Sequence, residues 1–252
     1  MTSLLLLDLL LLWSICLSTC SAGPGDLPSL SPQHVRFNSL DYKNVLKWDP
    51  PAGSSSDLHY HVQWKIGDVR SIVIQRCTYL SPPLCSSYGE KQWRDVDGCQ
   101  SIGRLTCDLS QVTSEPREWY YAQVSVSKPG SQSAWVLSPR FNPSWETSVS
   151  SPILRLSVKE QGIVVRLRPP RSPLRRANGK RISMARLQRL TYKVYLIPPN
   201  GKEEVFEVEG CSKQLMIPNL SPRTRYCLQA QSIQPLLRQS SPRGNAHCVS
   251  TH

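Results

Sequence analysis

Residues 119–127 read WYYAQVSVS, and residues 224–233 read TRYCLQAQSI. In both segments polar and apolar residues alternate, which is typical of a strand with one buried face. Each segment has a tyrosine near its start, Tyr120 in the first and Tyr226 in the second. A tyrosine that opens the sixth strand of a β-sandwich can hydrogen-bond back across the preceding corner. Two such segments, one in each half of the chain, therefore predict two sandwiches in tandem.

The rest of the 252-residue chain supports this plan. Short alternating runs are separated by clusters of Pro, Gly and Ser, and no long segment has helical periodicity. Strands are expected at 33–38, 43–48, 59–66, 91–96, 105–109, 119–127 and 134–140, and then at 153–158, 162–168, 190–197, 203–209, 213–217, 224–233 and 246–250. We predict an all-β protein of two fibronectin type III or immunoglobulin-like sandwiches, over 31–141 and 148–250, with Trp48 and Trp64 in the core.

The strongly hydrophobic stretch of the chain is at the N-terminus. Residues 4–17 are dominated by leucine, and small residues follow at Ser21, Ala22 and Gly23. The run is shorter than the roughly 20 residues of a transmembrane helix. A run of this length before small residues is typical of a cleaved secretory signal. We expect a signal peptide over residues 1–22 and a secreted protein without membrane insertion.

Seven cysteines remain after that signal, and an exported protein commonly pairs them. Because seven is an odd number, one cysteine, Cys211, has no expected disulfide partner. Zinc is the competing interpretation, but the chain has no Cys-x-x-Cys motif and its five histidines lie apart from the cysteines, so no metal site is expected. The expected disulfides are Cys99–Cys107 around a polar turn, Cys227–Cys248 at the end of the chain, and Cys77–Cys85 within one segment.

Positive charge is concentrated in the second half of the chain. Residues 24–140 hold 12 Lys/Arg and 11 Asp/Glu, whereas residues 141–252 hold 18 and 6. Residues 171–189 lack strand character, and we expect them to be partly mobile or to form a short helix. A basic surface on an exported protein suits sulfated glycosaminoglycans, and a solvated loop without a dedicated ligand is the alternative. The glycan-binding candidates are Arg171, Arg175, Arg176, Lys180, Arg181, Arg186 and Arg189.

No motif indicates an enzyme. The chain has no Gly-x-Ser-x-Gly, no phosphate-binding glycine loop and no His-Glu-x-x-His. We therefore expect no catalytic activity, no cofactor and no nucleic-acid partner. The one Asn-x-Ser/Thr site, a candidate for glycosylation, is Asn219, and Pro222 directly follows its sequon.

Several stretches resemble the extracellular part of class II cytokine receptors, and within that family the interleukin-20 and interleukin-22 receptor group. They are residues 34–39 (HVRFNS), 44–48 (NVLKW), 60–65 (YHVQWK), 88–93 (YGEKQW), 119–124 (WYYAQV) and 139–147 (PRFNPSWET). The resemblance implies a bent elbow between the sandwiches and a site for interleukin-22 or a related interleukin-10-family cytokine. In the absence of an anchor it implies a soluble, monomeric decoy receptor.

The resemblance also carries cytokine-binding residues over by position. Tyrosine and tryptophan bury large areas at little entropic cost, and arginine adds directional donors, so such residues are favoured anchors. The candidates are Lys65, Tyr88, Gly89, Lys128, Gly130 and Gln132 in the first domain, Trp145 and Glu146 at the elbow, and Arg175, Arg176, Pro235, Leu236 and Arg238 in the second domain.

One segment departs from the family pattern. Residues 67–87 separate the strand that ends near Ile66 from Tyr88 and Gly89, and they bring a cysteine pair of their own. This insert reshapes or blocks the first binding loop, or it is a spliced segment that reduces folding or secretion. The sequence leaves both interpretations open.

Two functions compete with the decoy. The first is a heparan-sulfate- or matrix-binding adhesion module that uses the basic second domain. The second is a tissue-factor-like protease cofactor, which needs a membrane anchor. High salt separates glycan from cytokine binding, because screening weakens a charge patch far more than an apolar interface.

Overall fold

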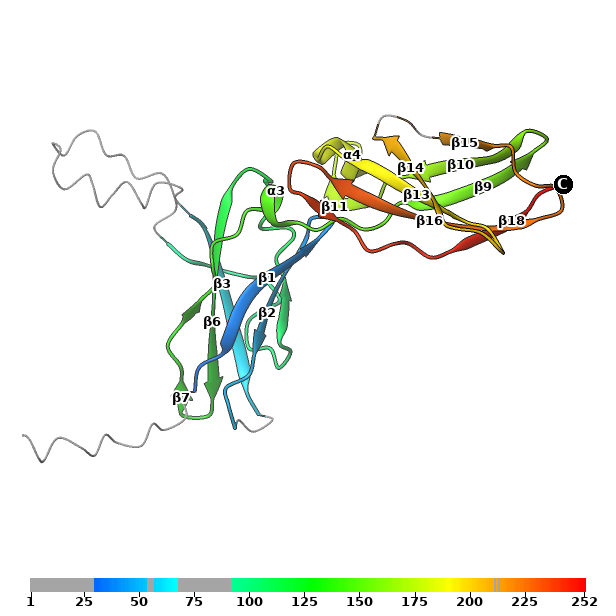
Figure 1. Ribbon diagram of the computed structural model, residues 1–252. Coiled ribbons are helices and arrows are strands. Elements are labelled where there is room, and N and C mark those ends of the chain that lie inside the picture. Colours follow the sequence, from blue (N-terminus) through cyan, green and yellow to red (C-terminus); the bar gives the residue numbers. More distant parts are fainter. Residues whose placement is uncertain (1–29, 54–56, 68–91, 211, 213) are drawn as a thin grey trace, which may run out of the picture.

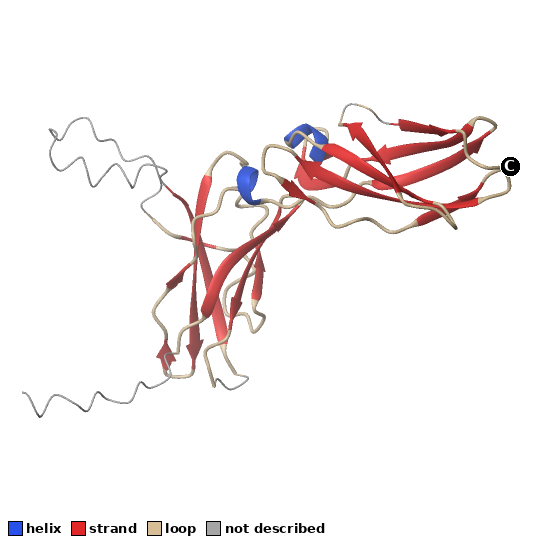
Figure 2. Ribbon diagram, in the orientation of Figure 1, coloured by secondary structure: helices blue, strands red, loops and turns tan. Residues whose placement is uncertain are grey.

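The structure is a computed structural model, and it describes residues 30–53, 57–67, 92–210, 212 and 214–252. Two β-sandwiches follow each other along the chain, with the short helix α3 (Pro143–Glu146) between them. Their long axes meet at a steep angle, and α3 lies at the bend (Figure 1; Figure 2). The expected all-β tandem with a bent elbow is confirmed.

The first sandwich consists of two antiparallel sheets. One has the order β1-β2-β5, and the other has the order β4-β3-β6-β7 with β8 also paired to β6. The strands are β1 (Gln33–Leu40), β2 (Lys43–Asp49), β3 (His59–Gly67), β4 (Arg94–Asp95), β5 (Thr106–Asp108), β6 (Trp119–Lys128), β7 (Ser131–Gln132) and β8 (Val136–Leu137).

The second sandwich repeats this arrangement. One sheet has the order β15-β10-β9, and the other has the order β14-β13-β16-β17 with β18 also paired to β16. A two-stranded hairpin and the helix α4 stand apart from both sheets. The elements are β9 (Ile153–Lys159), β10 (Gly162–Arg168), β11 (Arg171–Arg175), β12 (Arg181–Ser183), α4 (Met184–Leu187), β13 (Thr191–Ile197), β14 (Glu204–Glu209), β15 (Gln214–Pro218), β16 (Arg225–Gln234), β17 (Gln239–Ser240) and β18 (His247–Ser250).

Alternation along the strands builds the cores. In β3 the buried residues are Tyr60, Val62 and Trp64, and the residues between them face outward. Trp48 and Trp64 are buried in the first core, as the sequence predicted. Each large apolar side chain removed from water contributes about 1.5–3 kcal/mol, so the tandem core is the main source of stability.

Both predicted tyrosine corners form. Tyr120 Oη donates to the carbonyl oxygen of Glu115 at 3.1 Å, and Tyr226 Oη accepts from the backbone N–H of Ser221 at 3.1 Å. In each case the phenol bonds five residues upstream and fixes the loop that leads into the sixth strand.

Two of the expected strands are shorter than predicted. Of the described residues 92–96 only Arg94–Asp95 pairs as a strand, and residues 134–140 contribute only Val136–Leu137. Ser133 explains the second case, because its Oγ accepts from the Val126 N–H and donates to the Ala134 carbonyl. A side chain that hydrogen-bonds the backbone in this way takes the place of the hydrogen bonds between paired strands.

Residues 171–189 are more regular than the sequence indicated. The short helix is present as α4, but the expectation of no strand character is wrong, because β11 and β12 pair as a hairpin. Arginine replaces the usual apolar residues on these strands, so alternation of hydrophobicity could not reveal them. Of the expected disulfides, Cys99–Cys107 and Cys227–Cys248 form, whereas Cys77, Cys85 and Cys211 lie outside the described residues.

Candidate functional site

The helix α3 organises the surface at the bend. Asn142 is its N-cap: its Oδ1 accepts from the N–H groups of Ser144 (2.9 Å) and Trp145 (3.2 Å). Glu146 Oε1 accepts from the Asn142 N–H at 2.8 Å, a reciprocal bond like that of a capping box, with the acid one residue later than in the standard motif. This cap begins the helix directly after β8 and its loop, and it leaves the Trp145 side chain 61% exposed.

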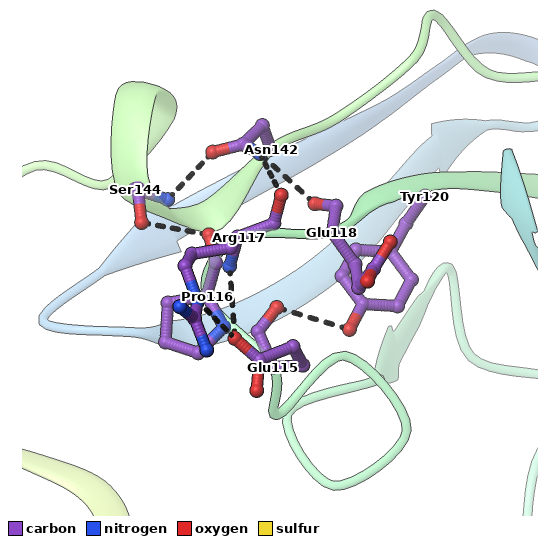
Figure 3. A network of polar contacts seen from close by, with 7 residues as sticks. All are labelled: Glu115, Pro116, Arg117, Glu118, Tyr120, Asn142 and Ser144. Atoms are coloured by element: carbon purple, nitrogen blue, oxygen red, sulfur yellow. Dashed lines mark hydrogen bonds and ion pairs between the residues drawn. The ribbon is translucent and has the colours of Figure 1, made fainter. Parts of the chain in front are cut away.

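Asn142 also holds the loop that precedes β6. Its Nδ2 donates to the carbonyl oxygens of Arg117 and Glu118 at 3.2 and 3.0 Å (Figure 3). Ser144 Oγ donates to the carbonyl oxygen of Pro116 at 2.7 Å in the same network. The Glu115 end of this loop is fixed by the Tyr120 corner, so α3 and the loop form one rigid unit.

Tyr42 joins the two sandwiches. It lies in the turn between β1 and β2 of the first sandwich, yet its side chain is buried in the core of the second. The Tyr42 N–H donates to Thr147 Oγ1 at 2.9 Å, and Ser39 Oγ donates to the same oxygen at 2.7 Å. These contacts lie between the sandwiches and fix the bend.

Two glutamines extend this junction to the second sandwich. Gln188 Nε2 donates to Tyr42 Oη at 3.3 Å and to the Ser144 carbonyl at 3.1 Å. Gln234 Nε2 bonds the Gln188 side chain and the Thr147 carbonyl. The turn that follows Gln234 is therefore held against α3 through buried amide groups.

A cavity of about 390 Å³ lies among these elements. Its apolar lining residues come from α3, from α4 and from the turn after β16, and Trp119 contributes from the start of β6. We call this the elbow surface; it consists of Arg117, Trp119, Asn142, Ser144, Trp145, Leu187, Gln188, Arg189, Gln234, Leu236 and Leu237. Leu236 is 76% exposed, so it and Trp145 are large apolar groups open to a partner.

The structure brings part of the predicted binding set to this surface. Trp145 and Leu236 line the cavity, and Pro235 and Arg238 flank Leu236 in the same turn. Glu146 is adjacent on α3, although one of its carboxylate oxygens is used by the bond from the Asn142 N–H.

Three predicted residues lie elsewhere. Lys128, Gly130 and Gln132 are at the end of β6 that pairs with His59, whereas Tyr120 at the other end pairs with Phe141 beside α3. This turn therefore lies at the end of the first sandwich away from the elbow surface, and its role in cytokine binding stays a prediction. Strand direction decides it, because connections before and after β6 lie at opposite ends of the sandwich.

The other candidates are spread out. Arg175 and Arg176 are exposed in the β11–β12 hairpin, and Arg175 lines a different cavity together with Asp95 and Arg104. The Lys65 ammonium lies 4.8 Å from the centre of the Trp93 ring. Tyr88 and Gly89 lie outside the described residues, but β3 ends at Gly67 opposite Trp119 of the elbow surface.

Sequence reasoning missed Arg117, Trp119 and Leu187. The Arg140 guanidinium stacks on the Trp119 ring at 4.4 Å, so this tryptophan is held in place beside the cavity. The sequence did offer a signal for Arg117 and Trp119, because both lie within the three residues before Tyr120. The loop that leads into this tyrosine corner is at the elbow end of the first sandwich. Nothing in the sequence pattern marked Leu187.

The candidate glycosylation site lies on the surface. Asn219 is exposed in the loop directly after β15, with φ of 58°. Among the described residues no three His, Cys, Asp or Glu side chains are placed to hold a metal ion. In the same part of the chain both helices have only four residues, and none is long and apolar enough to cross a membrane.

Known proteins resemble the chain over both halves. A family model described as tissue factor matches residues 6–135, and one described as interferon-alpha/beta receptor, fibronectin type III, matches residues 147–252. Among solved structures, the chicken interferon gamma receptor alpha chain superposes with a TM-score of 0.57 at 21% identity, covering 87% of this chain and 97% of that one. This likeness supports the fold.

Sequence relatives are more specific. Interleukin-22 receptor subunit alpha-2 of Mus musculus is 35% identical over 88% of this chain and 87% of its own length. The proteins of the same name from Rattus norvegicus and Homo sapiens are 34% and 32% identical, again over 88% of this chain, and cover 88% and 89% of their own lengths. These matches confirm the resemblance read from the sequence, including the likeness to the interleukin-20 and interleukin-22 receptor group. The chain belongs to the class II cytokine receptor family.

Proposed function

We propose that this protein binds an interleukin-10-family cytokine, interleukin-22, at the elbow surface and sequesters it as a secreted decoy. The observation that carries the proposal is the pair of exposed apolar side chains, Trp145 and Leu236, on either side of a cavity built from both sandwiches. Binding sites concentrate their energy in a few such anchors, surrounded by polar groups that exclude water.

The rigid junction supports this role. Tyr42, Gln188 and Gln234 hold the two sandwiches and the binding turn in one arrangement before any partner arrives. A preorganised surface does not have to order its loops upon binding, so more of the contact energy appears as affinity. Sequestration then needs no catalysis, since every bound cytokine molecule is removed from the free pool.

Two further points support the ligand and the decoy mechanism. The relatives of this chain carry the name interleukin-22 receptor subunit alpha-2. The leucine-rich segment at residues 4–17 is typical of an export signal, which would deliver the protein to the compartment where cytokines act.

Surface plasmon resonance with interleukin-22 of the same species tests the proposal, with other interleukin-10-family cytokines as controls. We expect tight binding that persists at 0.5 M NaCl. The Trp145→Ala and Leu236→Ala variants should each weaken binding at least tenfold, because truncating a central anchor typically costs 2 kcal/mol or more. In a reporter-cell assay the wild-type protein should block signalling by the cytokine.

Trp135→Ala is the matched control for Trp145→Ala. Trp135 is also partly exposed, at 37%, but it lies near the far end of β6, where Ser133 pairs with Val126. Its truncation should leave the affinity within twofold. Equal losses for the two tryptophan variants, or no binding of well-folded protein to any of these cytokines, would refute the proposal.

The insert is tested by removing residues 68–87, which keeps the Gly67–Trp119 pair intact. A rise in affinity for the cytokine would support the interpretation that the insert blocks the first binding loop. An unchanged affinity together with a higher secretion yield would support the splicing interpretation instead.

A further inference from the structure

Basic side chains gather on a second surface, formed by the β11–β12 hairpin and the elements around it. A cavity of about 870 Å³ is lined by Arg168, Arg171, Arg181 and Arg186. A second cavity of about 430 Å³ is again lined by Arg171 and Arg181, now together with Lys43 and Lys47 of β2. Because two arginines line both cavities, the six side chains form one continuous surface that crosses from the second sandwich to the first. We call it the basic surface.

Three carboxylates lie beside the basic surface, because Lys43 and Arg181 also line the cavity that contains Asp95, Asp97 and Asp108, but the two basic cavities themselves hold little negative charge. Within the described part of the chain, Asp41 is the one acidic residue that lines either cavity. Its carboxylate is already engaged, because Oδ1 accepts from the Ser150 N–H at 2.9 Å and Oδ2 accepts from Ser150 Oγ at 2.5 Å. Asp41 thus belongs to the junction between the sandwiches.

The neighbouring sheet adds to the charge. Arg155 on β9 lies directly opposite Arg166 on β10, and Arg166 and Arg168 are on the same outward face. Like charges directly opposite each other destabilise a sheet, and a bound anion relieves that repulsion. The ion pairs of the second sandwich, Lys193–Glu207 and Arg243–Glu203, involve β13 and the β14 side instead. These ion pairs therefore belong to a different sheet from the arginines of β9 and β10.

We propose that the basic surface binds sulfated glycosaminoglycan chains. Sulfate groups stay ionised at physiological pH, and a guanidinium group can donate two parallel hydrogen bonds to such an oxyanion. An extended chain with many sulfates can contact the first sandwich and the hairpin at once. The two disulfides indicate an oxidising extracellular compartment, where sulfated glycans are the abundant polyanions.

This surface is distinct from the elbow surface. The two meet at α4, where Arg186 lines the basic cavity and the next residue, Leu187, lines the elbow cavity. Glycan binding therefore does not depend on cytokine binding, and one can be lost without the other. A receptor held on matrix glycans would keep its cytokine site near the cell layer that exported it.

The test measures binding of the full chain to immobilised heparin at 150 mM NaCl. The triple variant R171Q/R181Q/R186Q removes three charges from the basic surface. The matched control K159Q/K202Q/R225Q removes three exposed charges from the opposite end of the second sandwich. We expect at least a tenfold loss for the first variant, less than a threefold loss for the control, and a steep decline of wild-type binding as salt rises.

Each other result overturns the proposal. Equal losses for the two variants would mean that net charge alone drives retention. Undiminished binding to fully desulfated heparin would exclude sulfate as the recognised group, and tighter binding to duplex DNA or to anionic lipid vesicles would assign the surface to another polyanion. Thermal unfolding of all variants checks the fold, and unchanged cytokine affinity of R171Q/R181Q/R186Q keeps this test separate from the proposed function.

Discussion

Tyr192 and Tyr195 lie three residues apart on β13, and their hydroxyl groups have different surroundings. Tyr192 is 1% exposed, and its Oη has no hydrogen-bond partner in the described part of the protein. Tyr195 Oη donates to Gln231 Oε1 at 2.7 Å, and the Arg243 guanidinium lies 3.6 Å from the centre of its ring. A buried hydroxyl without a partner costs free energy, whereas a bonded one contributes to stability.

The Tyr192→Phe substitution should therefore raise the free energy of unfolding by about 1 kcal/mol, since it removes only the unpaired hydroxyl. Tyr195→Phe is the matched control and should lower it by about 1 kcal/mol, because Gln231 Oε1 loses its donor. Urea unfolding followed by fluorescence measures both changes. A destabilised Tyr192→Phe would show that this hydroxyl has a favourable partner, such as a buried water.

Burial raises the pKa of Tyr192 to about 12. In the unfolded chain the phenol has its ordinary pKa near 10, so the folded state holds the proton more tightly. The stability from this group is complete below pH 10 and is lost as the pH rises from 10 through 12. Urea unfolding at pH 9, 10, 11 and 12 should show a larger loss for the wild type than for Tyr192→Phe; parallel curves would contradict the assignment.

At the scale of elements, α3 has only one turn and does not form through its own hydrogen bonds. Helix nucleation is costly, and a four-residue helix gains almost nothing from propagation. The Asn142 side chain compensates for the cost of nucleation with both of its polar atoms. Oδ1 caps the helix, and Nδ2 donates hydrogen bonds to the carbonyl oxygens of Arg117 and Glu118 (Figure 3). The helix and the loop before β6 therefore stabilise each other.

The Asn142→Asp substitution separates these two contributions. Aspartate keeps the capping acceptor, so it would be harmless if capping were the whole role of this residue. We expect it to lower the free energy of unfolding by about 2 kcal/mol, because the carbonyl oxygens of Arg117 and Glu118 lose their donor and face a carboxylate oxygen instead. Thermal and urea unfolding measure the loss. Ser144→Ala, which removes only the bond to Pro116, is the milder control.

The β16–β18 pair is held by Cys227–Cys248 across 21 residues. In the chain-entropy model, closing a loop of this length in the unfolded state stabilises the fold by about 3 kcal/mol. Replacing both cysteines by alanine should cost that amount in chemical unfolding under non-reducing conditions. A loss below about 1 kcal/mol would mean that the four-residue strand β18 is held by its ladder alone.

At the scale of the whole molecule, the angle between the sandwiches depends on Tyr42. Both turn residues, Asp41 and Tyr42, have positive φ (53° and 66°), as a two-residue hairpin with the type I′ turn requires. A bulky residue rarely adopts this conformation, and the strain costs of order 1–3 kcal/mol. Burial of the ring in the second core, only 1% exposed, offsets that strain.

The Tyr42→Ala substitution should remove about 3 kcal/mol of stability and uncouple the two sandwiches. We expect calorimetry to show two separated transitions and small-angle scattering to show a wider range of angles, with weaker cytokine binding as the result. Tyr42→Phe keeps the buried ring and loses only the bond from Gln188, so it should retain one transition. A single sharp transition for Tyr42→Ala would contradict the role of this anchor.

Much of the architecture could be predicted from the local pattern of polar and apolar residues. Alternation predicted β1, β2, β3, β6, β9, β10, β13, β14, β15, β16 and β18 to within a few residues, since most of these strands bury one face. The hairpin β11–β12 was missed because it stands apart from both sheets and carries arginine where strands usually carry apolar residues. In the candidate site, Trp145 and Leu236 could be chosen from the sequence, whereas the pattern could not show that the turn at 128–132 lies at the other end of the first sandwich.

By itself, the sequence determined the two sandwiches, their tyrosine corners, the pairing of Cys99 with Cys107 and of Cys227 with Cys248, and the excess of positive charge in the second half. All of these depend on residues close along the chain or on composition. Three features emerge only when the chain is folded: which loops meet at the elbow, the entry of Tyr42 into the second core, and the position of Lys43 and Lys47 beside the arginines of the hairpin. The physical reason is that strand direction and the docking of two sheets bring together residues that share no pattern along the chain.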